Sequence, residues 1–300
     1  MKHITIAASS RAFTELFAVL RNGFTFTNAD GGTFGPFSAN YSVSLHLSGG
    51  SVQLNDDDTV EVKNLLVEWD TLKLDLCFDL PGFCIGGYCL VPDPWNGCLV
   101  GVPKICIGGP ICIPIDLSGL VSKIAEFRAN LLASYFVDPT RDPAWSDLDA
   151  EFNGKSNQWR VFLNPVFVHV DPIDIPASLG NIIANLVTDA IRNTLPGPDW
   201  LKDLLIAALG PVLDLLKSIL GFVDDITGFI ADLLGNKFDL LGILETAIAD
   251  YFASHHPLYW FEDPYPIITG SGLIPVKIPI RDLDCHVNSK EMIVQANVGP

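Results

Sequence analysis

The chain has 300 residues, of which 49% are hydrophobic and 18% are charged, and this composition is typical of a folded protein with a large core. Its formal charge of −17 disfavours nucleic acid and anionic headgroups as partners. A neutral lipid stays compatible with this charge, because burial of an acyl chain depends on apolar area.

Linker-like segments rich in serine, glycine or charge do not divide the sequence, so we predict one domain that covers residues 1–300. The first ten residues contain an apolar run that is shorter than the central region of a signal peptide. No later stretch reaches the ~18 to 20 apolar residues of a membrane-spanning helix. We therefore expect a protein without a transmembrane segment, either cytoplasmic or exported without a recognisable signal peptide.

A strand followed by a helix opens the chain. Ile4 and Ile6 alternate with polar or small residues, and Ser9 or Ser10 can cap the helix that follows. The helix carries four large apolar residues on one face, and these are Phe13, Leu16, Phe17 and Leu20.

Long alternating strands come next. Apolar residues occupy every second position in 43–47 and again in 72–80, which predicts half-buried antiparallel strands. Asp56, Asp57 and Asp58 lie between two such runs. They could ligate calcium, but the segment lacks the glycine and terminal glutamate of a calcium loop, so we predict an exposed hairpin turn.

Residues 81–115 form an insertion rich in cysteine and glycine. Two similar pieces, 84–89 and 106–112, each place Gly-Gly between apolar residues, and this pattern favours two small hairpins over a phosphate-binding loop. Six of the seven cysteines lie in or next to this insertion, without a CxxC motif or a histidine, which argues against zinc. We expect all seven to be reduced and buried, whereas export would favour disulfides and leave one thiol over.

The apolar spacing in 117–136 predicts a helix, and strands are expected at 159–163 and 166–170. From Pro176 to Leu195 an apolar stripe at intervals of three and four residues predicts a long amphipathic helix. We expect this stripe to bind a hydrophobic ligand, although ordinary core packing would give the same pattern. The candidate ligand-binding residues are Leu179, Ile182, Ile183, Leu186, Val187, Ala190 and Ile191.

Further helices punctuated by glycine are predicted in 198–252, and strands at 276–280 and 292–298 end the chain. Nine acids interrupt the apolar faces of 198–252, which suggests that acidification could bring these helices to a membrane.

Motifs for catalysis are absent from the sequence: it has no G-x-S-x-G elbow, no H-E-x-x-H, no phosphate-binding loop and no kinase signature. His255 and His256 are the best metal candidates, but adjacent side chains point apart in regular structure, so a polar helix end is the better interpretation. The aromatic run 259–265 is typical of either a lid over the core or an anchor at a lipid surface. We predict no enzymatic activity, no cofactor and no metal.

Two segments resemble the tubular lipid-binding superfamily, whose best-known branch is bactericidal/permeability-increasing protein. Ile4 to Phe17 is similar to the opening strand and helix of that family, and Val168 to Leu195 is similar to its second passage from strand to long helix. The resemblance implies acyl chains held in a seam between sheet and helix. Some bacterial relatives accompany toxins, so it also implies a toxin-associated subunit as an alternative.

These observations together predict an α+β fold in which a long, highly curved antiparallel sheet wraps around long amphipathic helices, with an extra helical subregion at 198–252. The expected function is non-enzymatic binding of a lipid or other hydrophobic small molecule. The alternative is a protein-interaction subunit whose helices dock on a partner protein or, peripherally, on a membrane.

Overall fold

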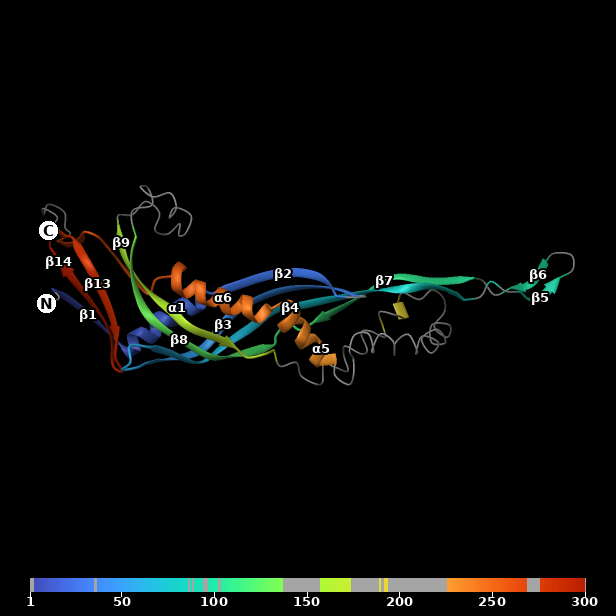
Figure 1. The fold of residues 1–300 in the computed structure, drawn as a ribbon, viewed down its shortest axis with the longest axis horizontal. Helices are drawn as coiled ribbons and strands as arrows, with labels where there is room; N and C mark the ends of the chain where they lie inside the picture. Colours follow the sequence, from blue (N-terminus) through green and yellow to red (C-terminus); the bar gives the residue numbers. More distant parts are fainter. Residues whose placement is uncertain are drawn as a thin grey trace.

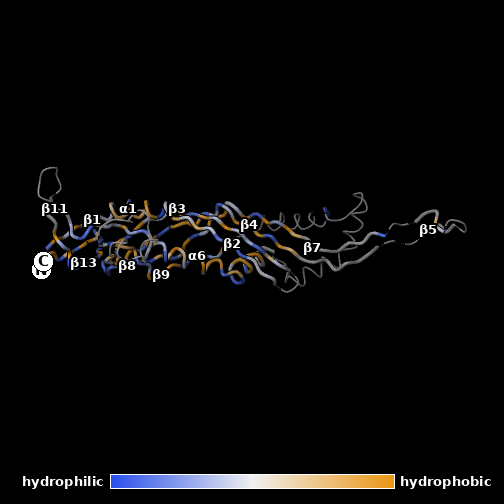
Figure 2. Tube along the Cα trace, turned by 90° about the horizontal axis from the view of Figure 1, so that it is seen from above, coloured by the Kyte–Doolittle hydropathy of each residue, from blue (hydrophilic) through white to orange (hydrophobic). Residues whose placement is uncertain are grey.

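The computed structural model describes residues 3–34, 37–85, 87, 89–93, 97–101, 104–136, 157–173, 189, 192–193, 226–268 and 276–299. In this part of the chain the molecule is elongated, with both termini at one end and the β5–β6 hairpin at the other (Figure 1). Hydrophobic and hydrophilic residues alternate in short stretches along the strands of the body (Figure 2).

The predicted fold class is wrong. The described residues are mostly β-strand, and the α-helices among them are short: α1 (Ser10–Gly23), α5 (Ile226–Asp232) and α6 (Leu240–Asp250) have 14, 7 and 11 residues. No sheet wrapped around long amphipathic helices is present in the described part. The predicted long helix from Pro176 to Leu195 lies outside the described residues except at 189, 192 and 193, which are helical.

The main sheet has the strand order β10-β9-β8-β4-β3-β2, and β7 also pairs with β4. All of its pairings are antiparallel. Its strands are β2 (Thr25–Phe34), β3 (Phe37–Leu54), β4 (Val60–Ile85), β7 (Ile105–Asp116), β8 (Val121–Phe136), β9 (Gln158–Val170) and β10 (Tyr259–Glu262).

Strand β4 organises this sheet because it is long enough to pair with two strands on one edge. It pairs with β3 from Val60 to Phe78, while its other edge pairs first with β8 and then with β7. The predicted alternation is confirmed here: Val43, Leu45 and Leu47 of β3 are at most 4% exposed. Such alternation gives each strand one face for the core and one for water.

The predicted helix 117–136 is wrong, since most of this segment forms strand β8. Ser122 and Ile124 are buried, and after a bulge between Ile124 and Glu126 the buried positions become Phe127 and Ala129. A bulge inserts one residue and shifts the buried set by one position. The spacing of three from Ile124 to Phe127 therefore looks helical in the sequence although the backbone is extended.

Between β7 and β8 the chain bends beside Trp69 of β4. Gly119 has φ +82°, and its amide donates to the carbonyl of Trp69 at 2.7 Å. A residue with a side chain would be strained in this left-handed conformation, so glycine is needed at the bend. The Trp69 indole N–H donates to the buried Ser122 hydroxyl at 2.8 Å and ties β4 to β8.

Helices cover one face of the main sheet (Figure 1). As predicted, strand β1 (Ile4–Ser9) leads into α1, and the Ser9 hydroxyl caps the helix by accepting from the Ala12 amide at 3.3 Å. Phe17 of α1 stacks on Phe252 of the π-helical turn η3 (Tyr251–His255), with ring centroids 5.7 Å apart. Phe127 packs against both rings and joins the helices to the sheet.

The described part of the predicted helical region 198–252 consists of α5, the π-helical turn η2 (Leu233–Lys237), α6 and the start of η3. Its apolar residues are buried in the core, including Ile230, Leu234, Leu244 and Ile248, each fully buried. These apolar residues of 226–252 therefore face the core, and the association of 198–252 with a membrane in acid stays a prediction. Among the described residues, no helix combines the length and apolarity needed to cross a membrane.

The hairpin predicted at 106–112 is not formed, because this piece lies within strand β7, and the piece 84–89 is described only in part. Residues 106–112 pair instead with residues 77–84 of β4, with Cys84 opposite Cys106 and Cys77 opposite Cys112 in the β4–β7 ladder. The hairpin lies further out and consists of β5 (Cys89–Asp93) and β6 (Gly97–Gly101). The expectation of seven reduced cysteines is also wrong, because Cys77–Cys112 and Cys89–Cys98 are disulfides.

A smaller terminal sheet has the order β1-β14-β13, with β13 (Ile280–Val287) and β14 (Glu291–Val298). The short strands β11 (Tyr265–Ile268) and β12 (Val276–Ile278) form a separate pair. Strand β14 confirms the strand predicted at 292–298, whereas most of the strand predicted at 276–280 is β12 of that separate pair. The turn between β3 and β4 fastens the terminal sheet to the main sheet. Asp58 accepts from the Val287 amide at 2.5 Å, and Asp56 accepts from the Ser289 amide at 2.9 Å.

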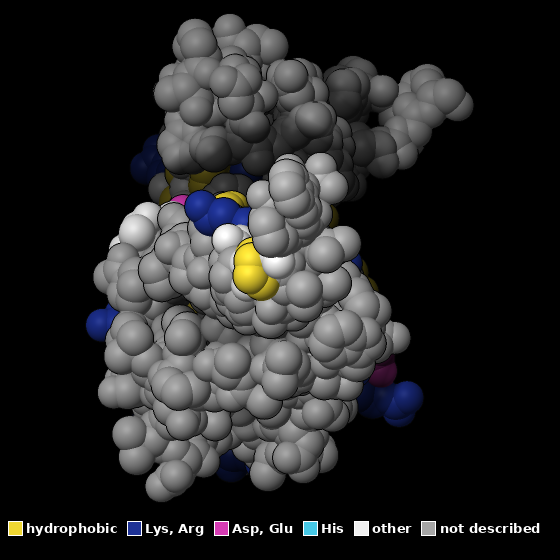
Figure 3. All heavy atoms as spheres, turned by 90° about the vertical axis from the view of Figure 1, so that its right-hand side faces the viewer, with side chains coloured by type: hydrophobic (Ala, Val, Ile, Leu, Met, Phe, Trp, Pro, Cys, Tyr) yellow, Lys and Arg dark blue, Asp and Glu magenta, His cyan; other side chains and the backbone are white. Residues whose placement is uncertain are grey.

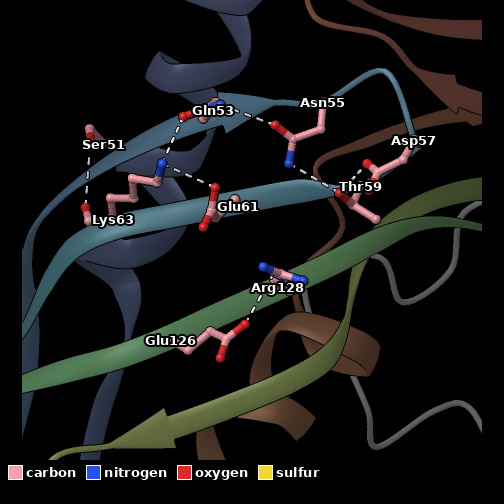
Figure 4. A network of polar contacts seen from close by, with 9 residues as sticks. All are labelled: Ser51, Gln53, Asn55, Asp57, Thr59, Glu61, Lys63, Glu126 and Arg128. Atoms are coloured by element: carbon pink, nitrogen blue, oxygen red, sulfur yellow. Dashed lines mark hydrogen bonds and ion pairs between the residues drawn. The ribbon is translucent and has the colours of Figure 1, made fainter.

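The predicted hairpin turn at these aspartates is confirmed, because Leu54 pairs with Val60 across it. Cross-strand polar contacts support the hairpin (Figure 4). Lys63 of β4 donates to Gln53 of β3 at 2.9 Å, and along its own strand it lies 3.2 Å from Glu61. Closer to the turn, Asn55 donates to the Thr59 hydroxyl at 3.1 Å.

Candidate functional site

An apolar groove of about 560 Å³ lies between α1 and the terminal sheet. Strands β1 and β14 form one wall, α1 forms the other, and the ring of Tyr259 from β10 contributes to the lining. The lining residues are Ile6, Ala8, Ala12, Glu15, Leu16, Val19, Tyr259, Met292 and Val294.

The strand wall follows from the register of β1 and β14. Ile6 pairs with Val294, and Ala8 pairs with Met292, so these four side chains share one face of the terminal sheet. Met292 and Val294 are buried, whereas Ile6 is 42% exposed. The outer half of the wall is therefore open.

The helix wall exists because α1 is apolar on two sides. Phe13 and Phe17 are buried in the core of the main sheet. Ala12, Leu16 and Val19 follow one another at spacings of four and three, so they form a second stripe that faces the groove. Val19 is 71% exposed, which leaves a large apolar side chain in water at the groove.

Charge is scarce in this groove. Glu15 is the one charged residue in the lining, and it lies on the exposed side of α1. The described protein exposes nine large hydrophobic side chains, and Ile6, Val19 and Tyr259 of the groove are three of them. Single exposed apolar residues are ordinary, but a concave group of them indicates a binding surface.

A polar cluster on β3 and β4 also brings reactive side chains together. The Nδ1 of His46 lies 2.9 Å from Asp70, its Nε2 lies 3.4 Å from Glu68, and Ser48 donates to Glu68. A nucleophilic serine would need its hydrogen bond to the imidazole. Here both imidazole nitrogens face carboxylates and the serine is bound to Glu68, so the cluster lacks the geometry of a nucleophilic site.

Of the two adjacent histidines that are the best metal candidates of the sequence, the structure describes the side chain of His256. The ring of His256 packs on Tyr251 at 4.3 Å between centroids. Within the described ranges no group of three or more histidine, cysteine or acidic residues could hold a metal ion. In the aromatic run, Phe261 is buried in a small cluster with Ile280 and Ala296, and Tyr259 is exposed at the groove.

The predicted ligand-binding residues Leu179, Ile182, Ile183, Leu186, Val187, Ala190 and Ile191 lie outside the described residues, so their contribution stays a prediction. The groove at α1 was missed. Its signal was present in the sequence, because Val19 lies away from the face of Phe13 and Phe17 and gives α1 a second apolar side. The pairing of β1 with β14, nearly 290 residues later, gives no local signal.

No protein-family model matches this chain, and no curated protein is significantly similar to it. The resemblance to the tubular lipid-binding superfamily is thus neither supported nor opposed by a relative, and it stays a prediction. The function is argued from the groove itself.

Proposed function

We propose that this protein binds a hydrophobic ligand, an acyl chain of an uncharged or zwitterionic lipid, in the groove between α1 and the terminal sheet. The observation that carries the proposal is the open apolar lining around Ile6, Val19 and Tyr259. Covering such side chains releases ~25 cal/mol for each Å² of apolar surface removed from water. The volume of about 560 Å³ falls in the usual range of small-molecule sites, ~300 to 1,000 Å³.

The charges favour a ligand without a negative headgroup. Glu15 is exposed at the groove and carries the same sign as the whole chain, whose formal charge is −17. A carboxylate or phosphate monoester would meet like charge there, with no lining lysine or arginine to offset it. A long-chain alcohol, an acylglycerol or a zwitterionic phospholipid avoids this repulsion.

The test compares two substitutions of the same kind. Ala12→Trp places an indole in the groove from the exposed side of α1, and we expect it to abolish most binding of a fluorescent long-chain alcohol. Ala7→Trp is the control, since Ala7 is exposed on the opposite face of β1 and is not part of the lining. The control should bind like wild type.

Organic extraction of the purified wild type followed by mass spectrometry identifies any natural ligand. Acyl lipid should co-purify with wild type and Ala7→Trp, and much less should co-purify with Ala12→Trp. If wild type neither carries lipid nor binds the alcohol, or if both tryptophan variants bind it equally, the groove is not a ligand site.

A further inference from the structure

The arm formed by the end of β4, by β7 and by the β5–β6 hairpin is nearly free of charge. From Leu80 to Ile115 the charged residues are Asp93 and Lys104, one acid and one base. The other residues contain 34 acids and 17 bases, because the whole chain has 35 and 18, so the full charge of −17 lies outside the arm. Repulsion between the protein and negatively charged groups of a lipid surface should therefore be weakest at the arm.

The arm also extends away from the main sheet, at the end opposite the two termini (Figure 1). Beyond Phe78 the described pairing of β4 is with β7 alone, and β5 and β6 pair with each other, so this end of the molecule is a two-stranded ribbon. Figure 1 shows the β5–β6 hairpin at the end opposite the two termini. In the view onto that end, hydrophobic atoms lie at the centre of the front with lysine or arginine atoms beside them (Figure 3).

A two-stranded ribbon is marginally stable in water by itself, because it has little to pack against. Two disulfides compensate for this in the arm. Cys77–Cys112 closes the base, and Cys89–Cys98 closes the hairpin. The two bonds therefore link the strands of the ribbon at its base and in the hairpin, where the strand sequences are Cys-Leu-Val-Pro-Asp and Gly-Cys-Leu-Val-Gly.

We propose that the β5–β6 hairpin is a docking element for the surface of a zwitterionic lipid bilayer. Lipid suits this segment better than a partner strand, because Pro92 in β5 and Pro110 and Pro114 in β7 lack the amide donors that strand addition uses. The outer edges of a two-stranded ribbon carry unpaired backbone groups, which cannot enter the hydrocarbon centre. The hairpin therefore inserts shallowly, among headgroups and the first methylene groups.

Flotation of the intact protein with phosphatidylcholine vesicles tests the proposal. Val91 and Val100 are cross-strand partners in the hairpin, and the double variant Val91→Asp/Val100→Asp should reduce vesicle binding by at least ~10-fold, since carboxylates resist burial at the interface. The control, Val121→Asp/Val166→Asp, adds the same two charges at valines of the body that are 54% and 64% exposed. It should bind vesicles like wild type.

Peptide mapping without reductant should show the Cys89–Cys98 bond in both double variants, which establishes that the hairpin is intact. Replacing a third of the phosphatidylcholine by phosphatidylglycerol should weaken binding of wild type, because its charge is −17. The inference is overturned if wild type does not float, if both double variants lose binding equally, or if anionic lipid strengthens it.

The groove variant Ala12→Trp separates this inference from the proposed function. It should float like wild type while failing to bind the long-chain alcohol. If Ala12→Trp loses flotation and the hairpin variant keeps it, the membrane contact lies at the groove and the docking role of the hairpin is wrong.

Discussion

At the scale of single residues, the exposed side chain of His46 lies between the carboxylates of Glu68 and Asp70. Asp70 is the extra residue at a bulge in β4, where Ser44 pairs with Thr71 and Leu45 with Trp69. Its hydrogen bond to His46 raises the pKa of that imidazole above the ordinary value, and the charges of Asp70 and Glu68 act in the same direction. The protonated imidazole is thus favoured in the folded protein.

The raised pKa of His46 makes the stability of the folded protein depend on pH. A raised pKa in the folded state adds stability that is fully present below the unfolded value, ~6.5, and that is lost as the pH rises through the folded pKa. We expect Asp70→Asn to lower the pKa of His46, measured by NMR titration of the imidazole, and to reduce the loss of stability from pH 6 to 8. Asp75→Asn, the same change further along β4, should leave the His46 titration as in wild type. Equal titrations in the two variants would contradict this assignment.

At the scale of elements, the disulfides of the arm determine how many free thiols the oxidised protein should contain. Cys84 and Cys106 are facing residues in the same ladder as the bonded pair Cys77–Cys112, so we predict that they form a third disulfide. Cys285 is free, and burial together with Asp284 and Asp58 raises the pKa of its thiol to about 12. It should react slowly while the protein is folded.

A thiol titration of the oxidised protein should therefore find about one thiol after denaturation without reductant and almost none before it. Finding three after denaturation would mean that Cys84 and Cys106 stay reduced. Disulfides persist in oxidising compartments, so a count of one thiol would agree with export, which stays a prediction.

Some of the helices and strands could be predicted from the sequence, and others could not. Strand β14, residues 43–47 of β3 and helix α1 could be predicted because each keeps one period and buries one face. The bulge of strand β8 breaks the period of two, so the sequence pattern there indicates a helix. The arm was misjudged because glycine pairs were read as turns, whereas Gly109 lies within β7 opposite Leu80.

Only the α1 side of the groove can be predicted from the sequence. The second apolar side of α1 can be read from Val19, but the strands that face it come from the two ends of the chain. Pairing between distant segments depends on how the whole sheet closes, and local periodicity does not contain this information. The groove could therefore be located only from the structure.

At the scale of the whole molecule, the turn between β3 and β4 holds the main sheet and the terminal sheet together. Asp58 has φ +65° and accepts from the Val287 amide. Asp58→Ala removes a hydrogen bond to a charged group and places alanine in the left-handed region, so the free energy of unfolding should fall by about 1 to 2 kcal/mol. Asp58→Asn, which tolerates this conformation and keeps an acceptor, should lose less in urea denaturation. Equal losses would show that the hydrogen bond contributes nothing.

Acid should loosen the same contact through Asp56. The hydrogen bond from the Ser289 amide, followed by one from its side chain, lowers the pKa of this carboxyl below its ordinary value. A lowered pKa in the folded state adds stability above the unfolded value, ~3.9, which is lost as the pH falls through the folded pKa. Amides of β13 and β14 should then lose protection against hydrogen exchange below about pH 4 before those of β3 and β4 do, after correction for intrinsic rates.

Two neutral variants isolate the contribution of Asp56 to this acid response. Asp56→Asn should weaken the protection of β13 and β14 already at neutral pH and reduce its further loss in acid, because the titrating acceptor of the Ser289 amide is gone. Asp57→Asn removes the same charge from the same turn, but Asp57 accepts from Thr59 within the turn. It should therefore keep the acid response of wild type. If the two variants respond alike, the net charge of the turn, and not the contact with Ser289, controls how the terminal sheet is held.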